Sequence, residues 1–127
     1  MTRFFLICLG GAVGSGARYL VSLAALRVLG AGFPWGTLAV NTIGSAAMAF
    51  LVELAVAGAA FSPTVQAALT TGVLGGFTTY STFNTEGLRY LQAGEYGLAV
   101  VYLAGTMAAC LVAGVLGILA ARWVAGP

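Results

Sequence analysis

Lysine, aspartate and histidine are absent from this 127-residue sequence, so five arginines and three glutamates carry all of its side-chain charge. Charged residues make up only 6% of the chain, far below the roughly 25% that is typical of soluble domains. Histidine and aspartate, two of the common general bases, are absent, and the sequence contains no cysteine–histidine cluster and no phosphate-binding loop motif. This composition disfavours an enzyme, and a net charge of +2 is too small to indicate nucleic-acid binding.

Cysteine is also scarce, because the chain has only Cys8 and Cys110, and both fall in apolar segments. We interpret them as small apolar fillers rather than as a disulfide. Hydrophobic residues, in contrast, make up 61% of the sequence. They form four segments long enough to cross a bilayer as helices, at roughly 20 residues per crossing. The approximate bounds are 3–29, 37–58, 64–92 and 95–122.

Turn-forming residues separate these segments. Pro34 and several glycines lie in 30–36, and a very short turn at 92–94 contains Gly94. In the turn at 59–63, Ser62 is suited to cap the next helix and Pro63 to occupy its first position. We therefore predict an all-α fold with four transmembrane helices, forming a single integral membrane domain over residues 1–127.

The third segment contains a polar interruption. Residues 72–83 read GVLGGFTTYSTF, in which Gly75 and Gly76 precede a block rich in hydroxyl groups. Glycine weakens a helix interior, and Ser and Thr side chains can satisfy the backbone groups that a helix break leaves open. We predict that this helix is broken near 75–79. Discontinuous membrane helices are a known way to build an ion site, so this stretch is the candidate functional centre.

Further polar residues lie inside the other apolar segments. Asn41 is either a helix–helix hydrogen-bonding residue or a pore-lining amide, and its spacing does not decide between the two. Arg18 lies in the first segment, where a buried charge is costly, so we favour a role in tying helix ends together over a role as a ligand. Glu86 is three residues before Arg89, at a spacing that permits an ion pair on a helix.

Four of the five arginines are evenly divided between the two ends of the predicted bundle, and the position of Arg18 is ambiguous. Arg3 and Arg122 lie on the side of both termini, and Arg27 and Arg89 lie on the opposite side. Membrane orientation follows the Lys/Arg bias between the loops, so this balance permits insertion in both orientations. We hypothesise that two oppositely inserted copies form an antiparallel homodimer.

Three stretches together resemble the Fluc (CrcB-type) fluoride channel family of small four-span membrane proteins. They are GGAVGSGARY at 10–19, GTLAVNTIGS at 36–45 and GVLGGFTTYSTF at 72–83. The resemblance covers all four segments in order and length, and the third stretch is the most specific. It implies a dual-topology antiparallel homodimer in the cell's inner membrane. It further implies two pathways for passive fluoride export, which relieves fluoride toxicity, and a sodium ion at the centre of the dimer.

The resemblance also implies roles for individual residues. Phe83 and Tyr80 match the paired pore aromatics of the family, although the usual residue at the position of Tyr80 is Phe. The backbone carbonyls of Gly75 and Thr78 match the sodium ligands, and Arg18 matches the family's first-span arginine. The remaining candidates for the fluoride pathway offer amide or hydroxyl donors: Asn41, Ser81, Thr82, Tyr102 and Thr106.

Two other functions stay open at this point. A small dual-topology proton-coupled multidrug exporter needs a carboxylate inside a span, and Glu53 and Glu86 both lie near span ends. A structural subunit that only packs against larger partners would conduct nothing when purified alone. The sequence also leaves open whether the chain pairs with itself or with a paralogue.

Overall fold

The computed structural model describes residues 1–58 and 61–126, and this part of the chain contains helices and no strands. The prediction of an all-α chain is confirmed for these residues. Helix α1 spans Thr2–Leu29, α2 spans Trp35–Val56 and α6 spans Tyr96–Ala125. All three are long and apolar enough to cross a membrane, and their bounds lie within three residues of the predicted segments.

The remaining segment is divided into several helical pieces. It consists of α3 (Pro63–Ala67), a π-helical turn η1 (Ala68–Leu74), α4 (Gly75–Phe77) and α5 (Tyr80–Gln92). As predicted, Pro63 is the first residue of α3, and the Ser62 hydroxyl accepts a hydrogen bond from the Val65 N–H at 3.3 Å. Residues 59 and 60 of the predicted turn lie outside the described part of the chain.

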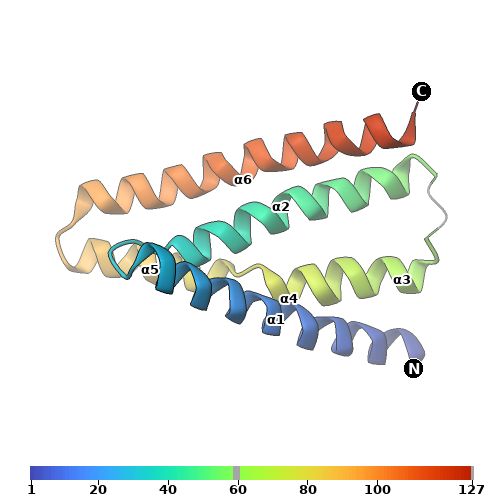
Figure 1. Ribbon diagram of the computed structural model, residues 1–127, viewed down its shortest axis with the longest axis horizontal. Helices are drawn as coiled ribbons and strands as arrows, with labels where there is room; N and C mark the ends of the chain where they lie inside the picture. The colour runs from blue at the N-terminus through green and yellow to red at the C-terminus, as the bar shows by residue number, and fades with distance from the viewer. Residues whose placement is uncertain (59–60, 127) are drawn as a thin grey trace.

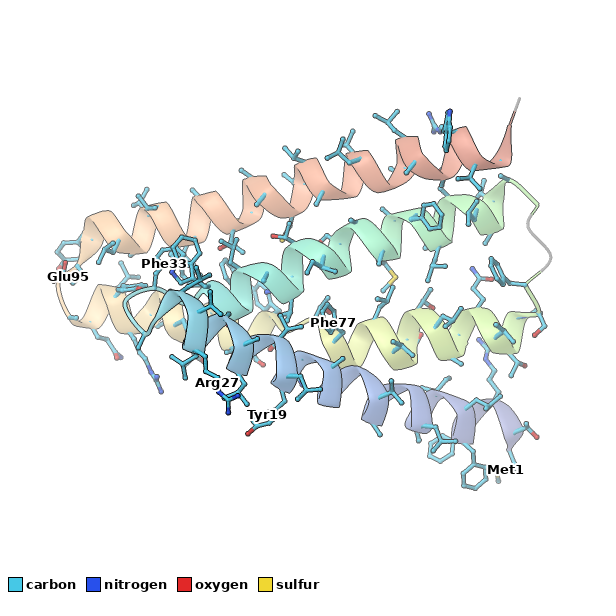
Figure 2. The ribbon with its side chains drawn as sticks, in the orientation of Figure 1. Met1, Tyr19, Arg27, Phe33, Phe77 and Glu95 are labelled. Atoms are coloured by element: carbon cyan, nitrogen blue, oxygen red, sulfur yellow. The ribbon has the colours of Figure 1, made fainter. Side chains whose placement is uncertain are left out.

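Helices α1, α2 and α6 and the segment from α3 to α5 all lie along the long axis of the molecule, and both termini lie at the same end (Figure 1). Arg27, Phe33 and Glu95 lie at the opposite end from Met1 (Figure 2). This arrangement separates the arginines near the two termini from those near the turns, as the sequence predicts.

Glycines allow α1 to approach η1 and α4 closely. A Cβ atom added at Gly10 would lie 2.6 Å from the carbonyl oxygen of Ala68, and one added at Gly76 would lie 2.5 Å from that of Gly11. Real side chains do not approach backbone so closely, so only glycine fits at these positions. Gly14 lies on the same stripe of α1, and the spacing of Gly10 and Gly14 is the small-residue pattern that permits close helix contact.

Much of the outer surface is apolar. On α6, for example, the exposed fraction is 64% for Val100 and 70% for Leu111. In the described part of the chain, the largest side chains that are completely buried are those of Tyr102 and Val40. An apolar surface of this kind suits contact with lipid, so the fold is that of a helical membrane protein.

Candidate functional site

Two consecutive extended residues separate α4 from α5. Thr78 has φ −80° and ψ 159°, and Thr79 has φ −150° and ψ 111°. The Thr79 hydroxyl caps α5 by accepting a hydrogen bond from the Thr82 N–H at 3.3 Å, and the Thr78 hydroxyl donates back to the Leu74 carbonyl at 3.0 Å. Hydroxyl side chains thus satisfy backbone groups on both sides of the interruption.

The glycines that drew attention to this stretch are themselves helical. Gly75 and Gly76 are the first two residues of α4. The irregular backbone begins after Phe77, at Thr78. Gly76 is required for a different reason, because its Cα lies against the backbone of Gly11 in α1. The irregular residues therefore lie at the edge of the 75–79 range expected from the sequence.

Asn41 holds the extended backbone in place from the neighbouring helix α2. Its Oδ1 accepts a hydrogen bond from the Thr79 N–H at 2.8 Å, and its Nδ2 donates to the Thr79 carbonyl at 3.0 Å. The amide thus pairs with Thr79 as an adjacent β-strand would. A primary amide has two N–H donors, so one remains for another acceptor. The two alternative roles of Asn41 are therefore compatible.

Arg18 also reaches the interruption. Its Nη1 donates a long hydrogen bond of 3.4 Å to the Thr78 carbonyl. Because the Thr79 N–H is bonded to Asn41, it does not reach the Gly75 carbonyl as it would in a continuous helix. The guanidinium group of Arg18 therefore lies close to Thr78 and Thr79. Backbone carbonyls that are not paired as in a regular helix lie at the same place.

A cavity of about 680 Å³ adjoins the interruption. Four of the predicted pathway residues line it together: Asn41, Tyr80, Phe83 and Thr106. None of the side chains that line it is charged. The rings of Tyr80 and Phe83 have centroids 6.0 Å apart, with Tyr80 largely exposed and Phe83 buried.

Thr106 is the unusual member of this set. It is 3% exposed, and within the described residues its hydroxyl has no hydrogen-bonding partner. A buried hydroxyl without a partner costs free energy, on the order of 1–3 kcal/mol, so its presence calls for an explanation. A ligand in the adjoining cavity would provide one.

The other three predicted pathway residues lie elsewhere. Ser81 and Thr82, on the first turn of α5, line a separate cavity of about 250 Å³ together with Glu86 and Arg89. Tyr102 is completely buried, with its ring centroid 5.3 Å from that of Phe83.

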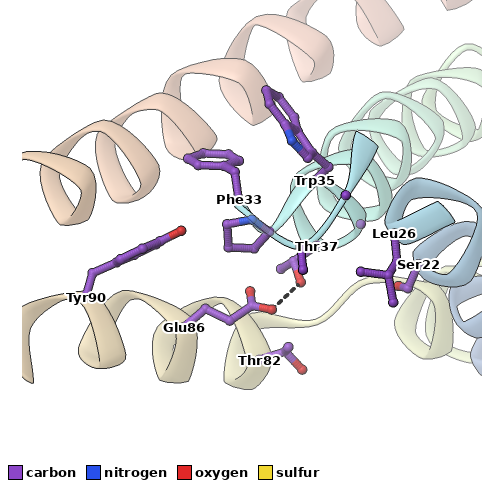
Figure 3. Close-up of a pocket in the computed structure, with 12 residues that line it drawn as sticks. Ser22, Leu26, Phe33, Trp35, Thr37, Thr82, Glu86 and Tyr90 are labelled. Atoms are coloured by element: carbon purple, nitrogen blue, oxygen red, sulfur yellow. Dashed lines mark hydrogen bonds between the residues drawn. The ribbon is translucent and has the colours of Figure 1, made fainter. Parts of the chain in front are cut away.

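The Tyr102 hydroxyl is directed to Glu86, a residue for which the sequence indicated pairing with Arg89 and no place in the pathway. It donates to Oε2 of Glu86 at 2.6 Å, and the Thr37 hydroxyl donates to Oε1 at 3.1 Å (Figure 3 shows the Thr37 bond). The expected pairing of Glu86 with Arg89 is not formed, because the carboxylate faces α2 and α6 instead. No spacing rule finds this cluster, since its members come from three helices.

Comparison with known proteins places the chain in a family. Residues 5–118 match the statistical model of the family described as CrcB-like protein, Camphor Resistance (CrcB). A protein of Anaeromyxobacter sp. (strain K) named fluoride-specific ion channel FluC is 48% identical over 126 residues, which cover 99% of this chain and 100% of the relative.

Two further proteins with the same name are similarly close. The one from Sorangium cellulosum is 47% identical over 96% of each chain. The one from Geobacter sulfurreducens is 43% identical over 96% of this chain and 98% of its own length. The chain therefore belongs to the CrcB family.

Proposed function

We propose that this protein is a fluoride-selective ion channel that lets fluoride leave the cell passively and so relieves fluoride toxicity. The observation that carries the proposal is the cavity beside the interruption, which is lined by neutral donors. The buried Thr106 hydroxyl has no partner among the described residues, Asn41 has one uncommitted N–H, and Tyr80 and Phe83 contribute ring edges. Ring edges carry partial positive charge, so they attract anions weakly.

Neutral donors suit permeation better than a buried arginine in the path would, because they bind the permeating ion more weakly. Fluoride is small and strongly hydrated, so a path through lipid must replace its water with other donors. A pathway must also release the ion, and weak sites in series allow this. The relatives named fluoride-specific ion channels, similar over nearly the whole chain, support the same conclusion.

The segment from 63 to 92 is, in this proposal, also a membrane crossing, the third in chain order, and it is broken at Thr78 and Thr79. Irregular backbone at membrane depth must be covered by protein or face water. Tyr80, next to the interruption, is largely exposed in the single chain. An oppositely inserted second copy, related by a two-fold axis in the membrane plane, would cover this region. The even division of four of the five arginines supports such a dual-topology homodimer, which we place in the inner membrane.

A structural sodium ion fits the chemistry of the interruption. The carbonyls of Gly75 and Thr78 are hard oxygen donors, and freed carbonyls at helix breaks are typical sodium ligands. Two copies would double the number of carbonyls. Within the described residues there is no group of three or more His, Cys, Asp or Glu side chains that could hold a metal. The bound ion would supply a fixed positive charge that favours anions.

The proton-coupled exporter is less well supported. Glu53 forms an ion pair with Arg122 at 2.7 Å near the terminal end of the bundle. Glu86 accepts two hydroxyl hydrogen bonds, so it is tied to its neighbours rather than free to exchange protons with a large substrate.

Fluoride efflux from liposomes tests the proposed function. Vesicles that contain the purified protein are expected to release fluoride to an external electrode, and Phe83→Ile is expected to slow the release. Efflux no faster than from protein-free vesicles would refute the proposal. Reporter fusions at the C-terminus test the topology, which a single fixed orientation would contradict.

A further inference from the structure

The two cysteines of the chain lie in different surroundings. Both are free thiols in the part of the chain that the structure describes, Cys8 on α1 and Cys110 on α6. Cys8 is exposed, whereas Cys110 is partly buried and lines the cavity of about 680 Å³ beside the interruption. A thiol that lines a cavity is within reach of water-soluble molecules that enter it, so Cys110 has a chemistry that a small apolar filler lacks.

Cys110 lies one helical turn after Thr106 on α6. Residues four apart share a face of a helix, and they are separated by about 6 Å along its axis. Thr106 lines the same cavity and is only 3% exposed, and its hydroxyl has no hydrogen-bonding partner among the described residues. A buried hydroxyl in this state indicates a ligand in the cavity. The Cys110 thiol therefore adjoins the position at which the ligand is expected.

The α2 wall of the cavity leaves room for a group attached to the thiol. Three small residues form part of this wall: Gly44, Ser45 and Ala49. The Ser45 hydroxyl donates to the backbone carbonyl of Asn41 at 2.7 Å, so it is turned toward its own helix. None of the side chains that line the cavity is charged. A charge attached to the Cys110 sulfur therefore meets no opposite charge among the lining residues.

The cavity extends toward the end of the bundle that holds the two termini. On α2 its lining runs from Asn41 to Val52, which are about 16 Å apart along the helix axis. Both α2 and α6 run from the turn end toward the terminal end (Figure 1). Cys110 follows Thr106 in this direction, so an ion that enters from the terminal end passes the level of Cys110 before it reaches the Thr106 hydroxyl.

We propose that Cys110 is a modification site inside the pathway, at which small water-soluble thiol-reactive compounds form an adduct whose charge decides whether fluoride still passes. This inference rests on the proposed function. With an alkyl methanethiosulfonate, the Cys110 thiolate attacks the divalent sulfur of the reagent and a mixed disulfide forms. Methanesulfinate leaves with the electron pair of the broken S–S bond, and the thiol proton passes to water.

The charge of the adduct acts on a permeating anion by Coulomb repulsion or attraction. A 2-sulfonatoethyl group adds one negative charge. For like charges roughly 6–8 Å apart at an effective dielectric constant of about 20, the repulsion slows transport by about 30-fold to 100-fold. A 2-(trimethylammonio)ethyl group is of similar size but carries a positive charge, so its adduct is expected to inhibit about tenfold less or weaker still.

Fluoride efflux from liposomes after treatment with each methanethiosulfonate tests the proposal. Cys8→Ser leaves Cys110 as the only thiol. Both reagents are permanently charged, so they reach thiols that face water and not thiols that face lipid. We expect the intact mass to increase by one adduct, the anionic reagent to lower fluoride efflux by the factor above, and dithiothreitol to restore it. Cys110→Ser, which keeps Cys8, is the matched control, and its efflux is expected to be insensitive to both reagents.

The outcomes separate this inference from the proposed function. If Cys8→Ser in liposomes conducts fluoride but forms no adduct, while the same protein is labelled after denaturation, the site is refuted and the channel stands. An adduct that leaves efflux unchanged, or equal inhibition by the two reagents, also contradicts the inference. If the unaltered, untreated protein releases no fluoride, the proposed function itself fails.

Discussion

Replacement of Asn41 by aspartate perturbs the candidate pathway at its most constrained point. The change preserves size and the hydrogen bond accepted from the Thr79 N–H, but it removes the donor to the Thr79 carbonyl. In the unaltered protein, Nδ2 of Asn41 lies 3.0 Å from the Thr79 carbonyl oxygen. In the variant, a carboxylate oxygen takes the place of Nδ2 and faces that carbonyl. Leaving the carbonyl without its donor costs about 1–3 kcal/mol.

The new charge has a second effect, on the permeating anion. For two like charges roughly 6 Å apart at an effective dielectric constant of about 20, Coulomb repulsion is about 3 kcal/mol. A barrier raised by this amount slows transport by about 100-fold. Because Asn41 lines the large cavity, we expect Asn41→Asp to lower fluoride efflux by at least that factor.

Efflux from liposomes at low protein density measures this effect, with the elution profile of the detergent-solubilised protein as a check on folding. Ser45→Ala is a matched control, because Ser45 lines the same cavity but donates its hydroxyl to the backbone of its own helix. That variant is expected to conduct normally. Folded Asn41→Asp protein with undiminished efflux would refute the assignment of the cavity as the pathway.

Three further substitutions have expected outcomes. Gly14→Val should destabilise the fold severely, because the new side chain would overlap the backbone of Val73; a thermal unfolding temperature close to that of the unaltered protein would contradict this packing. Thr106→Val removes a hydroxyl that has no partner in the described residues, so it should leave the stability unchanged or raise it, and it should lower fluoride efflux. A variant that loses stability and retains fluoride efflux would show that the hydroxyl is structural. Tyr102→Phe should lower the free energy of unfolding by about 1–3 kcal/mol, because Oε2 of Glu86 loses its donor, and an unchanged denaturation midpoint would argue against that bond.

The sequence was sufficient to predict the helical segments. Long apolar runs bounded by glycine and proline define helices in lipid, and α1, α2 and α6 follow them closely. The cap at Ser62 and Pro63 was also predictable, because capping depends on neighbouring residues only.

The location of the irregular backbone was predictable only approximately. A double glycine weakens a helix in isolation, yet Gly75 and Gly76 remain helical because α1 packs directly against them. The irregular residues are Thr78 and Thr79, where the amide of Asn41 from another helix replaces the helical partners of Thr79. Tertiary contacts thus decided the position, and spacing within one segment does not contain them.

The cluster around Glu86 was not predictable from sequence for the same reason. The rule for residues three apart on a helix pointed to Arg89, whereas the carboxylate meets hydroxyls from α2 and α6. The relative rotation of three helices determines this contact. Likewise, Tyr102 and Thr106 share one face of α6 but have different neighbours. Tyr102 is buried against the ring of Phe83, whereas Thr106 lines the large cavity.

The most direct test of the account is anion efflux from vesicles reconstituted with the purified protein alone. Fluoride is compared with chloride, with sodium present and with sodium replaced by a large organic cation. The account predicts rapid fluoride efflux, chloride efflux close to that of protein-free vesicles, and a loss of fluoride efflux when sodium is removed from protein purified without it. Equal efflux of both anions, or none of either, would contradict it.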